Sequence, residues 1–201
     1  MRISSSAHRS RPWRIHEIVA DFTLEDVWAL PVHGGAEDFP ELLERLTSLD
    51  PAASDSRAAR ALWRLRDLLG QWFDLGRISG DANEAPGDLP IPGTDETSLA
   101  GRLPDDLRAS AADVDFGSVP VSPLYLTHDE FAAEISNRTV HGVMHLAWVE
   151  EGAGRHRAQM AVYVKPRGPL GHAYMALIRP FRHLIVYPAL MRQIEAVALR
   201  R

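Results

Sequence analysis

Residues 121–164 have the sequence VSPLYLTHDEFAAEISNRTVHGVMHLAWVEEGAGRHRAQMAVYV, and this stretch decides the fold. It contains four runs rich in apolar, β-branched and aromatic residues, which predict strands at 121–127, 131–140, 143–149 and 158–164. Short turns separate them, at 128–130 and at the Gly-containing 150–154. Connections this short join antiparallel neighbours, because a parallel pair needs a long crossover. The sequence therefore predicts an antiparallel sheet.

A long apolar segment, Pro169–Leu199, follows the predicted sheet. Its apolar residues recur at spacings of three and four, which predicts a helix with one broad apolar stripe. An interior proline removes a backbone hydrogen bond and kinks a helix. We therefore expect the helix to bend or break near Pro180, and a second break at Pro188 stays open. Together, the predicted sheet and helix indicate an α+β helix-grip architecture, with a curved antiparallel sheet around a proline-bent C-terminal helix.

The first half of the chain carries weaker signals. Arg14–Phe22 is expected to be a strand, and Thr23 with Asp26 resembles a capping box that begins a helix through Leu30. Asp38 is expected to cap a second helix. The other expected elements are an amphipathic helix at 58–73, a flexible loop at about 79–98 and a short helical piece containing Leu99, Leu103 and Leu107.

Composition narrows the class of protein. The chain has no cysteine, which excludes disulfides, thiolate zinc sites and cysteine nucleophiles. Its formal net charge of −5 and the lack of an aromatic-and-basic motif do not suit a nucleic-acid binder. Residues 1–13 are rich in Ser and Arg, which predicts a disordered tail and no secretory signal. No apolar run is long enough to span a membrane, so we expect one cytoplasmic domain over 14–201.

Three blocks of the sequence resemble the uncharacterised bacterial domain-of-unknown-function 2867 family. They are AEISNRTVH at 133–141, YVKP at 163–166 followed by Gly171 and YMA at 174–176, and IRPFRHLIVYP at 178–188. The order of elements is also similar to the helix-grip fold of START-like lipid-binding domains, the birch-pollen allergen family and polyketide cyclases. The resemblance implies a domain that binds a small ligand.

The resemblance also implies a possible protein partner, because family members are sometimes joined to a nucleotide-binding oxidoreductase domain. Here that partner would be a separate oxidoreductase. Gly152-Ala153-Gly154 lacks the third glycine of a dinucleotide-binding fingerprint and lies in a predicted turn. We expect no cofactor.

Polar residues on the predicted strands are the candidate site. Alternation along one continuous strand would place Asn137 and His141 on the face opposite to Glu134 and Arg138. A metal site is not expected, because His141 and His145 would lie roughly 13 Å apart on an extended chain. The expected ligand-binding residues are Asn137, His141, His145, Trp148, Tyr163, Tyr174 and Phe181. The alternative is that the polar residues only pair with one another across strands.

Binding of a small hydrophobic or amphipathic molecule, in a cavity between the sheet and the C-terminal helix, is the function that we expect. Two alternatives stay open. One is a cyclase- or dehydratase-like enzyme with His141 or His145 as general base and Arg138 stabilising an enolate. The other is an interaction module whose C-terminal apolar stripe contacts a protein or a membrane surface. No nucleophile elbow or phosphate-binding loop is present in the sequence.

Overall fold

The computed structural model describes residues 1–47, 98–108, 110, 121–136, 140–188, 191–192 and 194 of the 201-residue chain. The expected helix at 58–73 and nearly all of the expected loop at 79–98 lie outside these residues.

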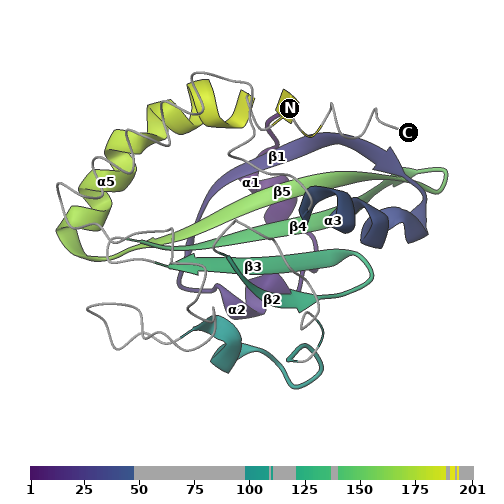
Figure 1. The fold of residues 1–201 in the computed structure, drawn as a ribbon, viewed down its shortest axis with the longest axis horizontal. Helices are drawn as coiled ribbons and strands as arrows, with labels where there is room; N and C mark the ends of the chain where they lie inside the picture. The colour runs from purple at the N-terminus through teal and green to yellow at the C-terminus, as the bar shows by residue number, and fades with distance from the viewer. Residues whose placement is uncertain are drawn as a thin grey trace.

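The architecture is α+β, with a five-stranded antiparallel sheet and a C-terminal helix packed against it (Figure 1). The strand order is β1-β5-β4-β3-β2. The strands are β1 (Thr23–Gly34), β2 (Ser122–Leu126), β3 (Glu130–Ser136), β4 (Val140–Gly152) and β5 (Arg155–Pro166). The four strands predicted within 121–164 are confirmed, and so is their antiparallel pairing.

The turn between β4 and β5 shows why this hairpin can be predicted from the sequence. Gly152, Ala153 and Gly154 all have positive φ angles, of 105°, 52° and 72°. Glycine adopts this region without strain, so two of the three positions suit their residues. The strands that flank the turn then pair along almost their whole length, from Gly152 opposite Arg155 to Val140 opposite Pro166.

The prediction for residues 14–30 is wrong. The expected strand Arg14–Phe22 contains the short helix α2 (Ile15–Ile18), and the expected helix from Thr23 is the start of β1. β1 pairs with β5, with a register shift between Leu24 and Asp26. This irregularity breaks the alternation of apolar residues, which hides the strand, and long-range pairing overrides the local capping signal.

Residues 1–13, expected as a disordered tail, carry the helix α1 (Ser5–Arg9) and pair with the sheet edge. The Ile3 N–H donates to the Val27 carbonyl at 2.9 Å, and the Ala29 N–H donates to the Met1 carbonyl at 2.8 Å. His8 and Trp13 are buried. A few buried side chains and backbone hydrogen bonds therefore order a segment whose composition alone suggests disorder.

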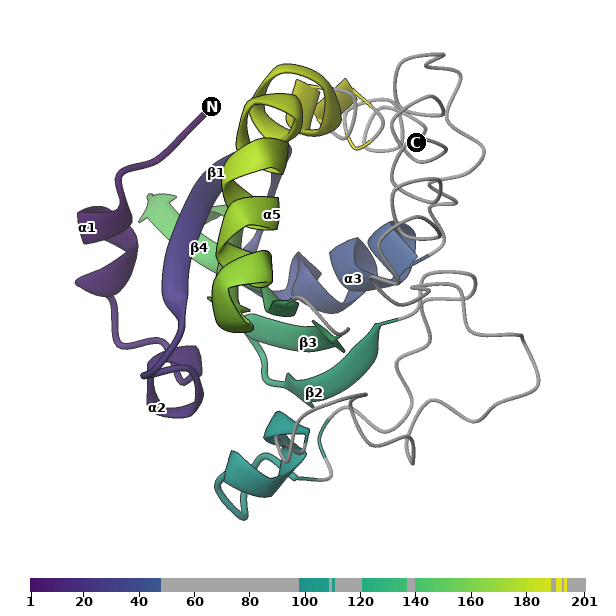
Figure 2. The ribbon, with the colours of Figure 1, turned by 90° about the vertical axis from the view of Figure 1, so that its left-hand side faces the viewer.

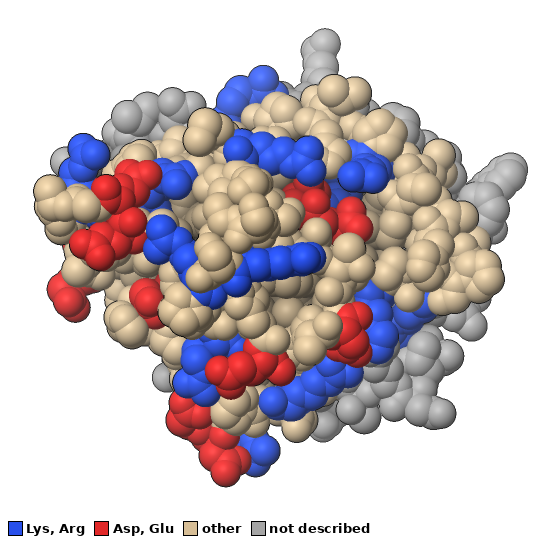
Figure 3. Space-filling view, turned by 180° about the vertical axis from the view of Figure 1, so that it is seen from behind, with Lys and Arg blue, Asp and Glu red and all other residues tan. Residues whose placement is uncertain are grey.

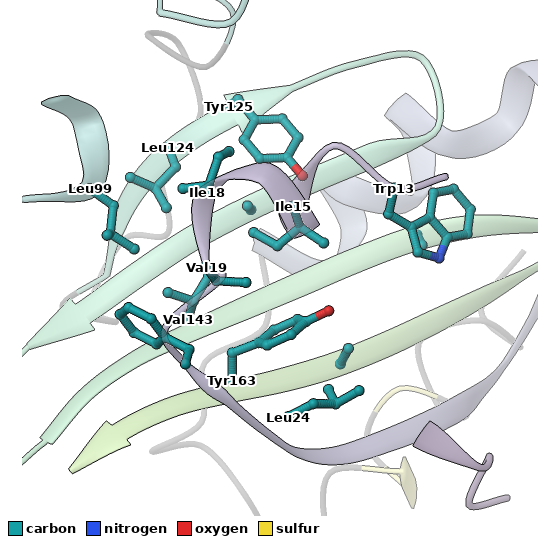
Figure 4. Packing of buried hydrophobic residues seen from close by; sticks show 14 of the residues in the cluster. Trp13, Ile15, Ile18, Val19, Leu24, Leu99, Leu124, Tyr125, Val143 and Tyr163 are labelled. Carbon is teal, nitrogen blue, oxygen red and sulfur yellow. The ribbon is translucent and has the colours of Figure 1, made fainter. Parts of the chain in front are cut away.

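Helices lie over both faces of the sheet. α1 and α2 lie on one side, and α3 (Phe39–Thr47) and α5 (Gly168–Phe181) lie on the other (Figure 2). The first side is packed by Ile15, Ile18 and Val19 against strand residues that include Val143 and Tyr163 (Figure 4). The short 3-10 helix η3 (Leu99–Arg102) lies with them, and Leu99, Leu103 and Leu107 are buried there as part of the same cluster. On the second side, two members of the core are Phe39 and Leu146.

The predicted helix α3 begins directly after the 3-10 turn η1 (Ala36–Asp38), and Asp38 accepts a hydrogen bond from the Gly35 N–H at 2.7 Å. The predicted C-terminal helix begins at Gly168, with Pro169 in its first turn. Helix α5 continues through Pro180 and is followed directly by the π-helical turn η4 (Arg182–Val186). A wider turn next to Pro180 is the expected result of its missing N–H and bulky ring. None of the helices in the described part is both long enough and apolar enough to cross a membrane.

Candidate functional site

Two buried glutamate–histidine pairs lie side by side on one face of the sheet. His141 Nε2 is 2.8 Å from Glu134 Oε2, and His145 Nε2 is 3.0 Å from Glu130 Oε2. Glu134 faces Val143 and Glu130 faces Ala147 in the strand register, so both pairs are diagonal neighbours two residues apart. Both histidine side chains are fully buried.

The face expected for His141 is wrong, because residues 131–141 are not one strand. β3 ends at Ser136 and β4 begins at Val140, and Ser136 lies opposite His141. The reversal brings His141 to the same face as Glu134. The alternative that polar strand residues pair with each other across strands is what the structure shows for this pair.

Each glutamate is held by several donors. Glu130 accepts hydrogen bonds from the Arg14 N–H at 3.0 Å and from the Tyr125 hydroxyl at 2.9 Å, besides His145. Burial alone would raise the pKa of the Glu130 carboxyl, but the hydrogen bonds outweigh burial and lower it. The Glu134 carboxyl accepts from the Leu99 N–H at 3.1 Å and from the Ser98 hydroxyl, and its pKa is lowered in the same way.

His8 of α1 extends this network toward the N-terminus. The Gln159 amide donates to His8 Nδ1 at 2.7 Å, and His8 Nε2 is 2.8 Å from the Tyr163 hydroxyl. An accepting Nδ1 makes His8 a neutral imidazole that donates from Nε2. Its ring centroid lies 5.4 Å from that of His145 and 5.5 Å from that of His16. Within the described residues, no group of three or more His, Asp or Glu side chains is arranged to hold a metal ion.

The molecular surface over the sheet face covered by α1 and α2 carries charges of both signs close together (Figure 3). Arg14 pairs with Asp106 at 2.8 Å, and Arg102 pairs with Asp21 at 2.6 Å. Paired charges of this kind produce little long-range field.

The opposite face, which carries α3 and α5, has apolar strand residues that are only partly covered. Met144 of β4 and Val162 of β5 lie opposite each other in the register and are half-buried, although both strands are interior to the sheet. Their neighbours on the other face, Val143 and Ala161, are 1% and 0% exposed. Tyr174 of α5 is also half-buried.

A polar cluster adjoins this row, because Asp26 of β1 lies opposite Val162. The Asp26 Oδ2 accepts from Arg182 Nη2 at 2.5 Å and from the Tyr187 hydroxyl at 2.9 Å. The Asp26 Oδ1 lies 3.3 Å from His183 Nε2. Trp28, half-buried, has its ring centroid 4.8 Å from that of Tyr187. The cluster ties η4 to the sheet.

The structure divides the residues predicted as a site. His141, His145 and Tyr163 lie on the face covered by α1 and α2, where they join the buried network. Trp148 lies on the other face, buried, and its Nε1 donates to the Gly35 carbonyl at 2.7 Å. Residues 137–139, which include Asn137 and Arg138, lie outside the described part. Phe181 is the last residue of α5, and its side chain is not described.

Sequence reasoning missed His8, Glu130, Asp26 and Trp28. The signal for Asp26 is an acidic residue directly before the apolar run Val27–Val32, because a charged residue beside a buried run is unusual unless the charge is paired. His8 had no signal, because its segment carries no apolar pattern.

Comparison with family models matches residues 18–189 to the family described as "Protein of unknown function (DUF2867)". Neither the curated proteins nor the solved structures include a match to the chain. The matched range contains all five strands, α5 and η4, whereas α1 and most of α2 precede it. The chain therefore belongs to the DUF2867 family.

Proposed function

We propose that the protein binds a small hydrophobic or amphipathic molecule between the sheet and α5, in the manner of a helix-grip domain. The observation that carries the proposal is the incomplete cover of Met144 and Val162 in the middle of the sheet. Interior strand positions that stay partly exposed on one face, while their neighbours on the other face are fully covered, leave some apolar surface for a ligand.

The composition of this face supports an amphipathic ligand. Val162 and Met144 supply apolar contact, and the adjacent Asp26, Arg182 and Tyr187 supply polar groups at one end of the row. Ligand sites typically combine a mostly apolar lining with a few polar groups that fix orientation.

The enzyme alternative depends on His141 or His145 as general base, and the surroundings of both side chains do not favour that role. His141 and His145 are fully buried, hydrogen-bonded to glutamates and on the face away from α5. A general base must come within hydrogen-bond reach of a substrate proton. We therefore assign the two histidines a structural role.

One observation favours a second candidate, which is contact with a membrane surface. Leu170, Leu177 and Leu184 recur every seventh residue along α5 and η4 and are exposed, and the neighbouring Arg179 is exposed as well. Exposed apolar residues with basic neighbours on a helix are typical of segments that bind the surface of a membrane containing anionic lipid. Co-sedimentation with anionic vesicles tests this candidate, and Leu177→Glu should abolish any binding that uses this stripe.

Native mass spectrometry of the purified protein, together with titration of a fluorescent fatty-acid probe, tests the ligand proposal. We expect a co-purifying small molecule or saturable probe binding. Val162→Trp should fill the partly exposed position and weaken probe binding at least tenfold, about 1.4 kcal/mol. His128→Trp adds the same side chain at a largely exposed position between β2 and β3 and should bind like the wild type. Equal probe affinity in both folded variants would refute the proposed location.

A further inference from the structure

The N-terminal segment, defined as residues 1–19, is a separate layer on the sheet. It covers the face that holds the buried network, with Ile15 and Ile18 in the core. It also pairs with the edge strand β1 through Ile3 and Val27. All of its residues except Ile18 and Val19 precede the range matched by the family.

His8 is the only residue of α1 that is buried, and its two hydrogen bonds require the neutral ring. Its Nδ1 accepts from the Gln159 amide. A second proton would be placed on this same atom, where it would face the Gln159 N–H donor. The hydrogen bond would be lost unless the Gln159 amide turned its oxygen toward the ring, and in either case the cation would be held away from bulk water, since His8 is 1% exposed.

The charges around His8 also oppose a proton. His16 of α2 and His145 of β4 contact its ring, and Arg9 lies beside it on α1. Glu130 of β3 is the facing carboxylate, and it is already engaged by His145, Arg14 and Tyr125. From β5, the facing groups are the Tyr163 hydroxyl and the neutral Gln159 amide.

The geometry points to an acid-operated latch, in which protonation of His8 releases the N-terminal segment from the sheet while the remaining domain stays folded. Release allows His8 to leave Gln159 and be hydrated as a cation. It uncovers the apolar and polar side chains of the sheet face beneath α1 and α2. The other face has its own core around Phe39 and Leu146, which does not include any residue of the segment.

The direction of the pH dependence follows from the shifts. Burial first, and then the neighbouring His145 and His16, lower the pKa of His8 to about 3, and burial lowers the pKa of His16. A released segment regains an ordinary histidine pKa of about 6.5 and so binds more protons than the docked one. Acidification below about pH 6.5 therefore favours release. Each such histidine raises the equilibrium constant for release by up to tenfold per pH unit.

Hydrogen exchange followed by mass spectrometry, corrected for the intrinsic pH dependence of exchange, tests the latch on the full chain. Between about pH 7.5 and about pH 4.5, we expect peptides from residues 1–19 to lose protection while peptides from β4 and β5 keep theirs. His8→Gln removes the titrating group and should shift the midpoint of release downward by about half a pH unit or more. His128→Gln, at a largely exposed histidine, should leave the midpoint unchanged.

Two results would overturn the latch. One is a segment that stays as protected in acid as at neutral pH. The other is release in His8→Gln at the wild-type midpoint. If His8→Gln is released at every pH, the His8 ring is followed instead by NMR in the wild type. A His8 titration near pH 6.5 with the segment still protected would then refute the inference.

Discussion

The substitution Asp26→Asn tests the contact that joins η4 to the sheet. Asp26 is fully buried and accepts hydrogen bonds from Arg182 and Tyr187, while His183 and Arg2 approach its other oxygen. Asparagine keeps the size of the side chain and removes its charge. The substitution therefore leaves the Arg182 guanidinium beside a neutral amide in a mostly buried position.

The magnitude follows from the exposure of each partner. Removing one member of a buried ion pair costs about 3–5 kcal/mol, and a hydrogen bond to a charged group contributes about 1.5–3 kcal/mol. Arg182 is 13% exposed and Arg2 is 55% exposed. Water can therefore replace part of the lost interaction at Arg182 and most of it at Arg2. We expect Asp26→Asn to lower the free energy of unfolding by about 3 kcal/mol, at the lower end of that range.

Urea unfolding followed by circular dichroism measures this change. The matched control is Asp106→Asn, which removes the acid of the Arg14–Asp106 pair at the surface, where Asp106 is 60% exposed. Surface pairs contribute little, so this control should unfold close to the wild type. Equal unfolding midpoints for the two variants would refute the reasoning. A second check is Asp26→Leu combined with Arg182→Met, which should recover part of the lost stability, because no unpaired guanidinium is left buried although the Tyr187 hydroxyl loses its partners.

Three further predictions concern other parts of the fold. Gly168 begins α5 with φ at +60°, so Gly168→Ala should lower the free energy of unfolding by about 1 kcal/mol, whereas Gly101→Ala should not, because its φ is not positive and nothing lies within 4 Å of the added Cβ. Trp148→Phe removes the hydrogen bond to the Gly35 carbonyl and should cost about 1 kcal/mol in urea unfolding, with faster amide exchange at the end of β1. Burial raises the pKa of the Glu134 carboxyl, but its hydrogen bonds lower that pKa by more, so the net shift is downward. A carboxyl whose pKa is lowered in the folded state adds stability above its unfolded pKa, and this contribution is lost as pH falls through the folded pKa. Stability of Glu134→Gln should therefore fall less steeply than that of the wild type below about pH 4.5, measured by urea unfolding across pH.

The strands from 121 to 166 could be predicted because their pairing is local. Each strand follows its neighbour after a short turn, and apolar runs mark each one. β1 could not, because its partner β5 lies more than a hundred residues later, and the irregularity after Leu24 disturbs its alternation. Local capping chemistry at Thr23 and Asp26 then predicts a helix. The partners of Asp26 include Arg182 on η4 and Tyr187 directly after it, which no local pattern reveals.

The candidate histidines were found from the sequence, but not their surroundings. Their face depends on where β3 ends and β4 begins, and a shift of one residue moves every side chain to the other face. Glu130 and Glu134 share the four-residue spacing of His141 and His145. In an antiparallel hairpin this matched spacing brings two Glu–His pairs together, a pattern that the sequence does contain.

The two buried Glu–His pairs favour one register between β3 and β4. Breaking a buried Glu–His pair leaves an uncompensated polar group, so a slipped register between β3 and β4 would disrupt both pairs at once. The pairs therefore fix which residues of β4 face α5. With the register fixed, His141, Val143 and His145 point to the covered face, and Met144 and Leu146 point to the face of the proposed site. Substitutions at the first group should alter stability with ligand affinity unchanged in the folded fraction, whereas conservative substitutions at Met144 should alter affinity first. Ligand affinity that responds equally to both groups would mean that the site does not lie on the α5 face.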